Sequence, residues 1–325
     1  MKIDQCLGYL KHPDSDEPAE FVLKDNTILD PQSGKQYPII HGMIDFTGIN
    51  IPEKDHSQNH RGLMFTANTL FSKYLDAKIL TSVFAGGGIG FAKAKKKMKI
   101  WLAQSANENI LFLEPEDKSL LSHIGKENCV TIEDLTSKNV LPAKEFYPDI
   151  NARMEKIPIR SNAFQTVLSY FVVEHVKDPR DHIKELARIL KPGGYLILGG
   201  PGDVYPSHRV PYNYFNIIRF GYYEMFKENN LELIEEYYPA KSWMSILYLA
   251  YTTVVRNSFF NNNQFTKSLQ LVIFLISMAI CPVLNGIALL LDKITPFDKR
   301  IYSLYLALVR KKPDEPLSAI SGDGE

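Results

Sequence analysis

Residues 157–201 read IPIRSNAFQTVLSYFVVEHVKDPRDHIKELARILKPGGYLILGGP, and this stretch decides the fold. Within it, Thr166–Val173 is an apolar run of strand length, rich in β-branched and aromatic residues. Pro179 can open a helix, and the apolar residues after it share one helical face: Ile183, Leu186, Ala187 and Leu190. Lys191–Gly194 ends that helix, and Tyr195–Leu198 is a second buried strand. This order predicts a parallel sheet with crossover helices.

The composition of the chain limits its partners. The 325 residues are enough for one large domain or two smaller ones. The 37 basic side chains (Lys and Arg) balance the 37 acidic ones, so charge gives no attraction to nucleic acid and we expect no nucleic-acid partner. Cys6, Cys129 and Cys281 are far apart, which indicates a reducing compartment without disulfides. Residues 1–8 lack the apolar core of a signal peptide.

The spacing of residues 157–194 resembles the second half of class I S-adenosylmethionine (SAM) methyltransferases, of the methyltransferase type 11 kind. The positions that match, in order, are Ile157–Ile159, Phe164, Glu174–Val176, Asp178–Pro179, Glu185, Arg188 and Leu190–Gly194. One position departs, since Gln165 stands where the family has Asp. The resemblance implies an α/β fold with a seven-stranded, mostly parallel, Rossmann-like sheet. In this chain a helical hydrophobic insertion would precede the last strand.

The resemblance also places the cofactor, SAM. The family's first glycine-rich turn corresponds to Glu114, Pro115 and Glu116, which replace its glycines. Pro115 removes an N–H donor, and the two carboxylates repel the carboxylate of SAM. Asp134, about twenty positions further on, would bind the ribose. The other cofactor-binding candidates that the resemblance implies are Arg153, Met154, Ser169 and Tyr170.

Two histidines are candidate catalytic residues. Methyl transfer needs an aligned pair of reactants, and a base if the acceptor is an alcohol or acid. His175 and His208 are the candidates for that base. Residues 208–222 resemble the segment that lies over the active-site mouth in the same group, with Asn213 in place of Asp and Asn216 in place of Arg. An aromatic loop that only packs is the alternative interpretation of this segment.

The end of the N-terminal segment, QYPIIHGMIDF at residues 36–46, resembles the close of a zinc-ribbon-like segment found before many bacterial methyltransferases. That family holds zinc with two C-x-x-C pairs. The four corresponding residues here are Cys6, Tyr9, Asp30 and Ser33. One thiolate of four cannot make a closed tetrahedral site, so we expect a degenerate ribbon without metal.

A long insertion suggests a membrane. Trp243–Val255 is apolar and aromatic, and Ser268–Leu291 has no charged residue over a length that spans a bilayer core. Pro282, Asn285 and Gly286 interrupt the second run, which predicts a re-entrant or interfacial hairpin. We therefore expect a peripheral or monotopic protein on the cytoplasmic, inner face of the cell membrane. A buried helical pair packed on the catalytic domain is the alternative.

The sequence thus predicts six segments: a degenerate ribbon-like segment (1–48), a linker with covering helices (49–100), a methyltransferase-like core (101–240), the hydrophobic insertion (241–297), a final strand (298–312) and a disordered tail (313–325). The favoured function is SAM-dependent methylation of a hydrophobic, small-molecule or lipid-linked acceptor at the membrane. The first alternative is a catalytically inactive scaffold with this fold. The second is a dinucleotide-binding protein that uses Gly86–Gly90, although Phe91 occupies the last position of the G-x-G-x-x-G pattern.

Overall fold

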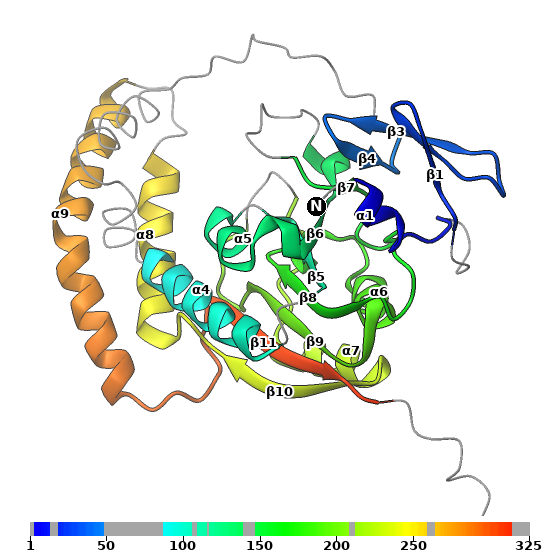
Figure 1. The fold of residues 1–325 in the computed structure, drawn as a ribbon. Helices are drawn as coiled ribbons and strands as arrows, with labels where there is room; N and C mark the ends of the chain where they lie inside the picture. The colour runs from blue at the N-terminus through cyan, green and yellow to red at the C-terminus, as the bar shows by residue number, and fades with distance from the viewer. Residues whose placement is uncertain are drawn as a thin grey trace, which may run out of the picture.

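The computed structural model describes residues 3–13, 19–48, 87–105, 109–115, 117–138, 147–207, 212–258 and 264–313. Within these residues one sheet has eleven strands in the order β1-β2-β3-β4-β7-β6-β5-β8-β9-β11-β10 (Figure 1). The predicted α/β class and methyltransferase-like sheet are confirmed. The strand count is higher than predicted because four short N-terminal strands join the seven core strands at one edge.

The seven core strands form the part of the sheet that carries the site. Five of them run parallel, from one edge inward: β7 (Ile150–Asn151), β6 (Cys129–Glu133), β5 (Ile110–Leu113), β8 (Phe164–Tyr170) and β9 (Leu190–Pro201). The final strand, β11 (Leu304–Lys311), inserts antiparallel between β9 and β10 (Leu231–Tyr237), as the sequence predicts. Strands β5 and β6 are buried at every position, which explains their continuous apolar runs.

The N-terminal segment adds α1 (Ile3–Leu7), β1 (Val22–Lys24), β2 (Thr27–Leu29), β3 (Gln36–Ile40) and β4 (Met43–Asp45). Parallel pairing of Ile44 with Ile150 joins β4 to the core, and the Asn151 amide donates to the buried Asp45 carboxylate at 2.9 Å. At one former ribbon position, Asp30 is buried, accepts hydrogen bonds from neighbouring groups and lies 2.9 Å from His12 Nε2. A buried carboxylate network therefore closes this turn. Its relation to a zinc ribbon stays a prediction.

Four helices cover the core: α4 (Gly87–Gln104), α5 (Lys118–Ile124), α6 (Pro179–Ile189) and α7 (Arg219–Glu228). Helix α6 begins where Pro179 predicts, and the Asp178 carboxylate caps it by accepting from the Arg180 N–H at 3.0 Å. One prediction boundary in this region is wrong: strand β8 ends at Tyr170, because Phe171 turns the chain with φ 59°. Helix α6 ends at Ile189, just before Lys191–Gly194, as predicted. These four residues lie within the bounds of β9 as an irregularity, since pairing with β8 passes from Leu190 to Tyr195 and Gly193 has φ 76°.

The glycine-rich run does not form a nucleotide-binding turn. Gly87–Gly90 is the first turn of α4, while Gly86 and the apolar run before it lie outside the described residues. A Cβ at Gly90 would come within 2.9 Å of the Ala240 Cβ and 3.0 Å of Leu304 Cδ1. Gly90 is therefore a close-packing position between α4 and the sheet, and the dinucleotide-binding alternative gains no support from the described residues.

The hydrophobic insertion forms a hairpin of two helices, α8 (Ser242–Ser258) and α9 (Gln264–Ile294), which stands beside the sheet domain (Figure 1). The predicted interruption is wrong, since α9 continues through Pro282. A proline in a helix interior removes one hydrogen bond, and burial of the flanking Cys281, Asn285 and Ala288 keeps the helix intact. In the described part of the chain, no helix combines the length and apolar character that crossing a bilayer requires.

The ion pair between Glu185 and Arg188 on α6 supports the segment Ile157–Ile159, where the family-like motif begins. Arg188 pairs with Glu185 at 2.8 Å and donates to the main-chain oxygens of Ile159, at 2.6 Å, and of Ile157, at 3.1 Å. The Glu185 carboxylate in turn accepts from the Ile157 N–H at 3.0 Å. The pair thus satisfies the backbone of a segment whose Ile157, Pro158 and Ile159 side chains are buried.

We predict that Arg188→Met lowers the free energy of unfolding by about 2–4 kcal/mol, because it removes charge-assisted hydrogen bonds and leaves the Glu185 carboxylate without its cation. The measurement is urea denaturation at neutral pH. Arg180→Met is the matched control on the same helix, since Arg180 forms an exposed pair with Glu228. The control should cost less than about 1 kcal/mol. Equal costs for the two variants would contradict the proposed role of Arg188.

Candidate active site

The candidate site lies at the carboxyl edge of the parallel strands. Leu113 of β5 pairs with Ile132 of β6 and with Ser169 of β8, so the residues after these strands come to one edge of the sheet. In open α/β sheets, ligands bind in the crevice outside this edge. Of the residues singled out from the sequence, this edge carries Glu114, Pro115, Asp134, Ser169, Tyr170 and His175, while Glu116 and His208 lie outside the described residues.

Glu114 keeps the backbone shape of the glycine that it replaces. Its φ of 49° lies in the left-handed region, which a non-glycine residue adopts at a cost. Its carboxylate turns toward β6 and accepts from the Asp134 N–H at 2.8 Å. Pro115 is buried beside it. The structure therefore brings Glu114 and Asp134 together and partly occupies the Glu114 carboxylate.

Asp134 is the acidic residue that follows β6. Its carboxylate accepts from the Thr136 N–H at 2.9 Å and from the Thr136 hydroxyl. Burial raises the pKa of this carboxyl; the hydrogen bonds from Thr136 oppose the rise, Glu155 adds to it and Arg153 lowers it. The predicted cofactor residue Arg153 is itself exposed and acts on Asp134 through its charge.

Met154 and Ser169 meet at a histidine that the sequence reading did not single out. The ring of His182, on α6, is fully buried; its Nδ1 lies 2.7 Å from the Met154 carbonyl oxygen and its Nε2 lies 3.5 Å from Ser169 Oγ. Burial lowers the pKa of His182, so the ring favours its neutral form. The sequence signal for this residue was a histidine on the apolar face of α6. Because His182 contacts Met154 and Ser169, we interpret it as a residue that positions them.

The most unusual group at this edge is Glu174, in the short 3-10 helix η3 (Val173–His175) that follows β8. Its side chain is 2% exposed, and neither carboxyl oxygen accepts a hydrogen bond from another described residue. Burial raises the pKa of this carboxyl to about 8; its own backbone N–H opposes the rise and the charge of Glu114 adds to it. An unsatisfied buried acid is costly, which makes it a candidate functional group.

The predicted base His175 is held against the loop that follows the sheet. Its Nδ1 lies 3.0 Å from the Tyr212 carbonyl oxygen, and its Nε2 lies 3.8 Å from Glu174 Oε1. The structure therefore places His175 at the mouth of the site and Glu174 inside it. The sequence offered a signal for Glu174, because an acidic residue within the apolar run VVEHV is unusual. The sequence analysis selected the neighbouring His175 instead.

Glu174 lies among tyrosines and one glycine. A Cβ at Gly200 would lie 3.4 Å from Glu174 Oε2 and 3.6 Å from the Tyr222 hydroxyl oxygen, so the bare backbone leaves room beside the acid. Burial raises the pKa values of Tyr170, Tyr205 and Tyr222, and the charge of Glu174 adds to each rise. The Tyr170 hydroxyl has no hydrogen-bond partner among the described residues. The Tyr170 hydroxyl and the Glu174 carboxyl oxygens, which lack a hydrogen-bond partner among the described residues, thus lie at the end of β8.

An exposed aromatic segment borders this group of side chains. The Tyr214 N–H donates to the Glu174 carbonyl oxygen at 2.7 Å, which fixes the segment over the acid. Tyr212, Tyr214 and Phe215 all expose their rings. On the side toward the hairpin, the Tyr205 ring lies 5.8 Å from the ring of Tyr248 on α8. Aromatic side chains therefore extend from the turn after β8 to the helical hairpin.

These side chains suit a ligand that brings hydrogen-bond donors and positive charge. Glu114, Asp134 and Glu174 offer carboxyl oxygens, and Tyr170 offers a hydroxyl that lacks a partner. SAM brings ribose hydroxyls, an ammonium group and a positive sulfonium, so the residues at this edge fit it. Its carboxylate is the exception, because Glu114 stands where a glycine would receive it.

Part of the chain is similar to known proteins. Residues 119–198 match the methyltransferase domain family. A tRNA U34 carboxymethyltransferase from Hahella chejuensis is 46% identical over 54 residues, which are 16% of this chain and 17% of that protein. The same enzyme from Cellvibrio japonicus is 42% identical over 57 residues, 16% of this chain and 18% of the other. The matched region thus spans under a fifth of each curated relative.

Solved structures include distant likenesses. Phosphoethanolamine N-methyltransferase 2 from Haemonchus contortus, in complex with SAM, has a TM-score of 0.41 and 14% identity, covering 67% of this chain and 53% of that one. The YcgJ protein from Bacillus subtilis has a TM-score of 0.39 and 13% identity, covering 68% and 98%. Similarity at this level does not determine function.

Replacing Glu174 tests the effect of its burial on stability. The folded protein holds this carboxyl neutral up to about pH 8, whereas the unfolded chain ionises it near the ordinary pKa of Glu. Between these two pKa values, Glu174 therefore lowers the free energy of unfolding more and more as pH rises. We predict that Glu174→Gln is more stable than the native protein at pH 9, and that this advantage shrinks toward pH 5. Urea denaturation across this range measures it. Glu224→Gln, an exposed control on α7, should show a small difference that stays constant with pH. A pH-independent difference for Glu174→Gln would refute the assignment.

Proposed function

We propose that this protein, whose residues 119–198 match the methyltransferase domain family, transfers a methyl group from SAM to a hydrophobic or lipid-linked acceptor at a membrane. The observation that supports this acceptor class is the position of Glu174, a buried acid that accepts no hydrogen bond from another described residue, beside the exposed Tyr212 and Tyr214. Bound SAM supplies an electrophilic methyl group on a positive sulfur. The residues of this chain supply the rest.

Glu174 acts as the base that removes a proton from the acceptor. A general base works best when its pKa lies near the operating pH, and burial brings this carboxyl to about 8. His175, held by the Tyr212 carbonyl, positions the entrance loop next to the acid. The buried Tyr222 and the half-buried Tyr170 exclude water and keep the Glu174 environment apolar.

The other end of the site binds the cofactor. Asp134 follows β6, and its carboxylate is placed to accept hydrogen bonds from ribose hydroxyls. Glu114, after the neighbouring strand, holds the Asp134 backbone by accepting from its N–H. His182 fixes Ser169 and the Met154 carbonyl beneath them, so this part of the site is rigid before a ligand binds.

The acceptor reaches the site from an apolar phase in this proposal. The exposed aromatic segment connects through Tyr205 and Tyr248 to α8, and the hairpin places exposed apolar residues beside the domain. The protein would then lie on the cytoplasmic, inner face of the cell membrane. RNA is less favoured, because Lys95 and Lys97 of the basic α4 pair with Asp117 and Glu235 within the fold.

The activity test follows the methyl label. The purified full chain is incubated with SAM labelled in its methyl group, together with a bacterial lipid extract, total tRNA or buffer. We expect label in the organic phase, at a rate that rises with pH up to about 8. Glu174→Gln should lower the rate by roughly 100-fold or more, the range for loss of a general base. Glu224→Gln is the control and should keep the native rate.

SAM binding, measured by calorimetry on the same samples, separates the outcomes. Binding without label in lipid, but with label in tRNA, would replace the proposed acceptor with RNA. Absence of both binding and label would identify the protein as an inactive scaffold with this fold. Native activity in Glu174→Gln would remove Glu174 from the mechanism while leaving methyl transfer in place.

We also predict that Glu114→Gly tightens SAM binding by about tenfold, because it removes a carboxylate from the turn that faces the carboxylate of SAM. Asp25→Gly is a matched control, since Asp25 is also a non-glycine residue in the left-handed region, with φ 52°, far from the site. Both variants relieve backbone strain, but only Glu114→Gly should change the dissociation constant in calorimetry. Unchanged affinity in Glu114→Gly would place SAM away from this turn.

A further inference from the structure

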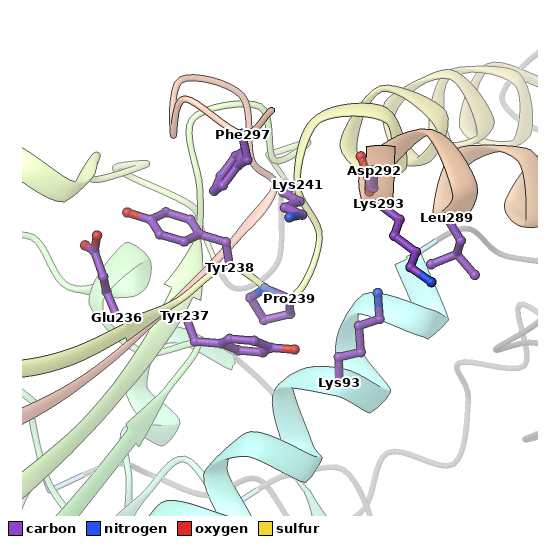
Figure 2. Close-up of a pocket in the computed structure, with 10 residues that line it drawn as sticks. All are labelled: Lys93, Glu236, Tyr237, Tyr238, Pro239, Lys241, Leu289, Asp292, Lys293 and Phe297. Carbon is purple, nitrogen blue, oxygen red and sulfur yellow. The ribbon is translucent and has the colours of Figure 1, made fainter. Parts of the chain in front are cut away.

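A cavity of about 350 Å³ lies at the base of the helical hairpin, between α4, the end of β10 and the last turn of α9 (Figure 2). Three lysines from three separate elements line it: Lys93 of α4, Lys241 immediately before α8, and Lys293 of α9. Figure 2 shows the amino groups of Lys93 and Lys293 turned toward the same space. Lys93 and Lys241 are half-buried, so part of their charge lies away from bulk water.

The positive charge of this pocket is not neutralised locally. In the described parts of the chain, none of the three lysines forms an ion pair, although Lys93 and Lys241 act on the Asp292 carboxyl at longer range. Asp292 caps α8 instead, accepting from the Trp243 N–H at 2.9 Å. The other carboxylate of the lining, Glu236, pairs with Lys299. The lysines therefore exceed the carboxylates available to them.

The remaining wall of the pocket is aromatic. The Lys241 ammonium lies 5.1 Å from the centre of the Phe297 ring, and that ring lies 5.0 Å from the Tyr238 ring. Aromatic rings attract a cation without neutralising its charge. A compact anion with several acceptor oxygens, such as a phosphate group, suits a pocket lined by three ammonium groups better than a single carboxylate does.

A wide apolar face begins at this pocket and runs along α9. Its exposed side chains, from the far end toward the pocket, are Val272, Ile276, Ile280, Val283, Ile287, Leu290 and Ile294. The opposite face, with Cys281 and Ala288, is buried. Exposed apolar patches of this kind mark interaction sites.

The composition of this face favours lipid over a second copy of the chain. Ile276 to Ile294 follow three- and four-residue spacing, which also suits a coiled coil, but coiled coils place charged side chains beside the seam. Among the described side chains beside the seam, the exposed residues Ala279, Leu284 and Gly286 are uncharged, and the charge of Lys293 stands only at the pocket end. Trp243, exposed near the pocket and 3.2 Å from Thr295 through its indole nitrogen, is a residue type typical of membrane–water interfaces.

We propose that the pocket formed by Lys93, Lys241 and Lys293 binds the phosphate of an anionic membrane lipid, while the apolar face of α9 lies against the acyl chains. The hairpin then rests in the surface of the bilayer with its basic end at the headgroups. This inference rests on the membrane part of the proposed function and deepens it, because it names the lipid chemistry that would hold the domain beside its acceptor.

Vesicle flotation of the full chain tests the proposal. One set of vesicles contains phosphatidylcholine alone, and the other contains phosphatidylcholine mixed with phosphatidylglycerol. We expect binding to the mixed vesicles and little binding to the neutral ones. Replacing Lys93, Lys241 and Lys293 together by Gln should weaken binding by roughly a hundredfold, the expected effect of three charges near an anionic surface. The matched control replaces three exposed lysines elsewhere, Lys24, Lys96 and Lys184.

Further variants and ligands distinguish binding to a lipid from binding to a free phosphate compound or to a second copy of the chain. Ile280→Glu with Ile287→Glu should abolish flotation while leaving heat release on titration with glycerol phosphate unchanged, because only the apolar contact is lost. Heat release with glycerol phosphate, but no flotation of any variant, would identify a site for a free phosphate compound and overturn the lipid assignment. A dimer in light scattering that Ile280→Glu with Ile287→Glu dissolves, without vesicle binding, would assign the face to a second copy.

Equal weakening in the pocket and control lysine variants would also overturn the proposal, because it would show only a general charge effect. SAM titration of the same proteins distinguishes this inference from the proposed function. Native SAM binding with no vesicle binding rejects the lipid pocket alone, whereas vesicle binding without SAM binding rejects methyl transfer and leaves the lipid pocket standing.

Discussion

Parallel pairing of β8 with both β5 and β9 is the constraint on which the site depends. Ser169 of β8 aligns with Leu113 on one side and Leu198 on the other, and all three strands are buried there. A slip of one residue would turn every side chain of β8 to the opposite face, so the register is strongly specified. The strand then stops at Tyr170, because Phe171 takes a left-handed conformation. That stop directs the following turn, with Glu174, toward the carboxyl edge.

A half-buried acid and a fully buried acid in the same motif show how structure and function use charge differently. Glu185 is paired with Arg188, and the pair satisfies the backbone at Ile157, so this charge stabilises the fold. Glu174 accepts no hydrogen bond from another described residue and is held among tyrosines. Such a group costs stability, and proteins retain it where chemistry needs a proton acceptor of raised pKa. Satisfaction of hydrogen bonds, rather than burial alone, separates the two roles.

The helical hairpin has a buried face and an exposed apolar face. Helix α9 buries Cys281 and Ala288 on one face while exposing Val283 and Ile287 on the other. Close packing on the buried side sustains the helix through Pro282, so the exposed side presents a continuous surface. At its end, Lys293 converges with lysines from two other elements. An apolar face that ends in concentrated positive charge matches the profile of an anionic membrane surface, where hydrocarbon and phosphate lie next to each other.

The sequence by itself determined the parts that local pattern controls. The α/β order, the start of α6 at Pro179, strand β10 and the final antiparallel β11 follow from apolar periodicity and motif spacing. Tertiary structure decided which strand pairs with β4, whether Gly90 turns or packs, and whether Pro282 interrupts a helix. It also decided that Glu174 accepts no hydrogen bond from another described residue and that three lysines, far apart in the chain, line one pocket. Burial and partnership depend on contacts between distant residues, and no local pattern encodes them.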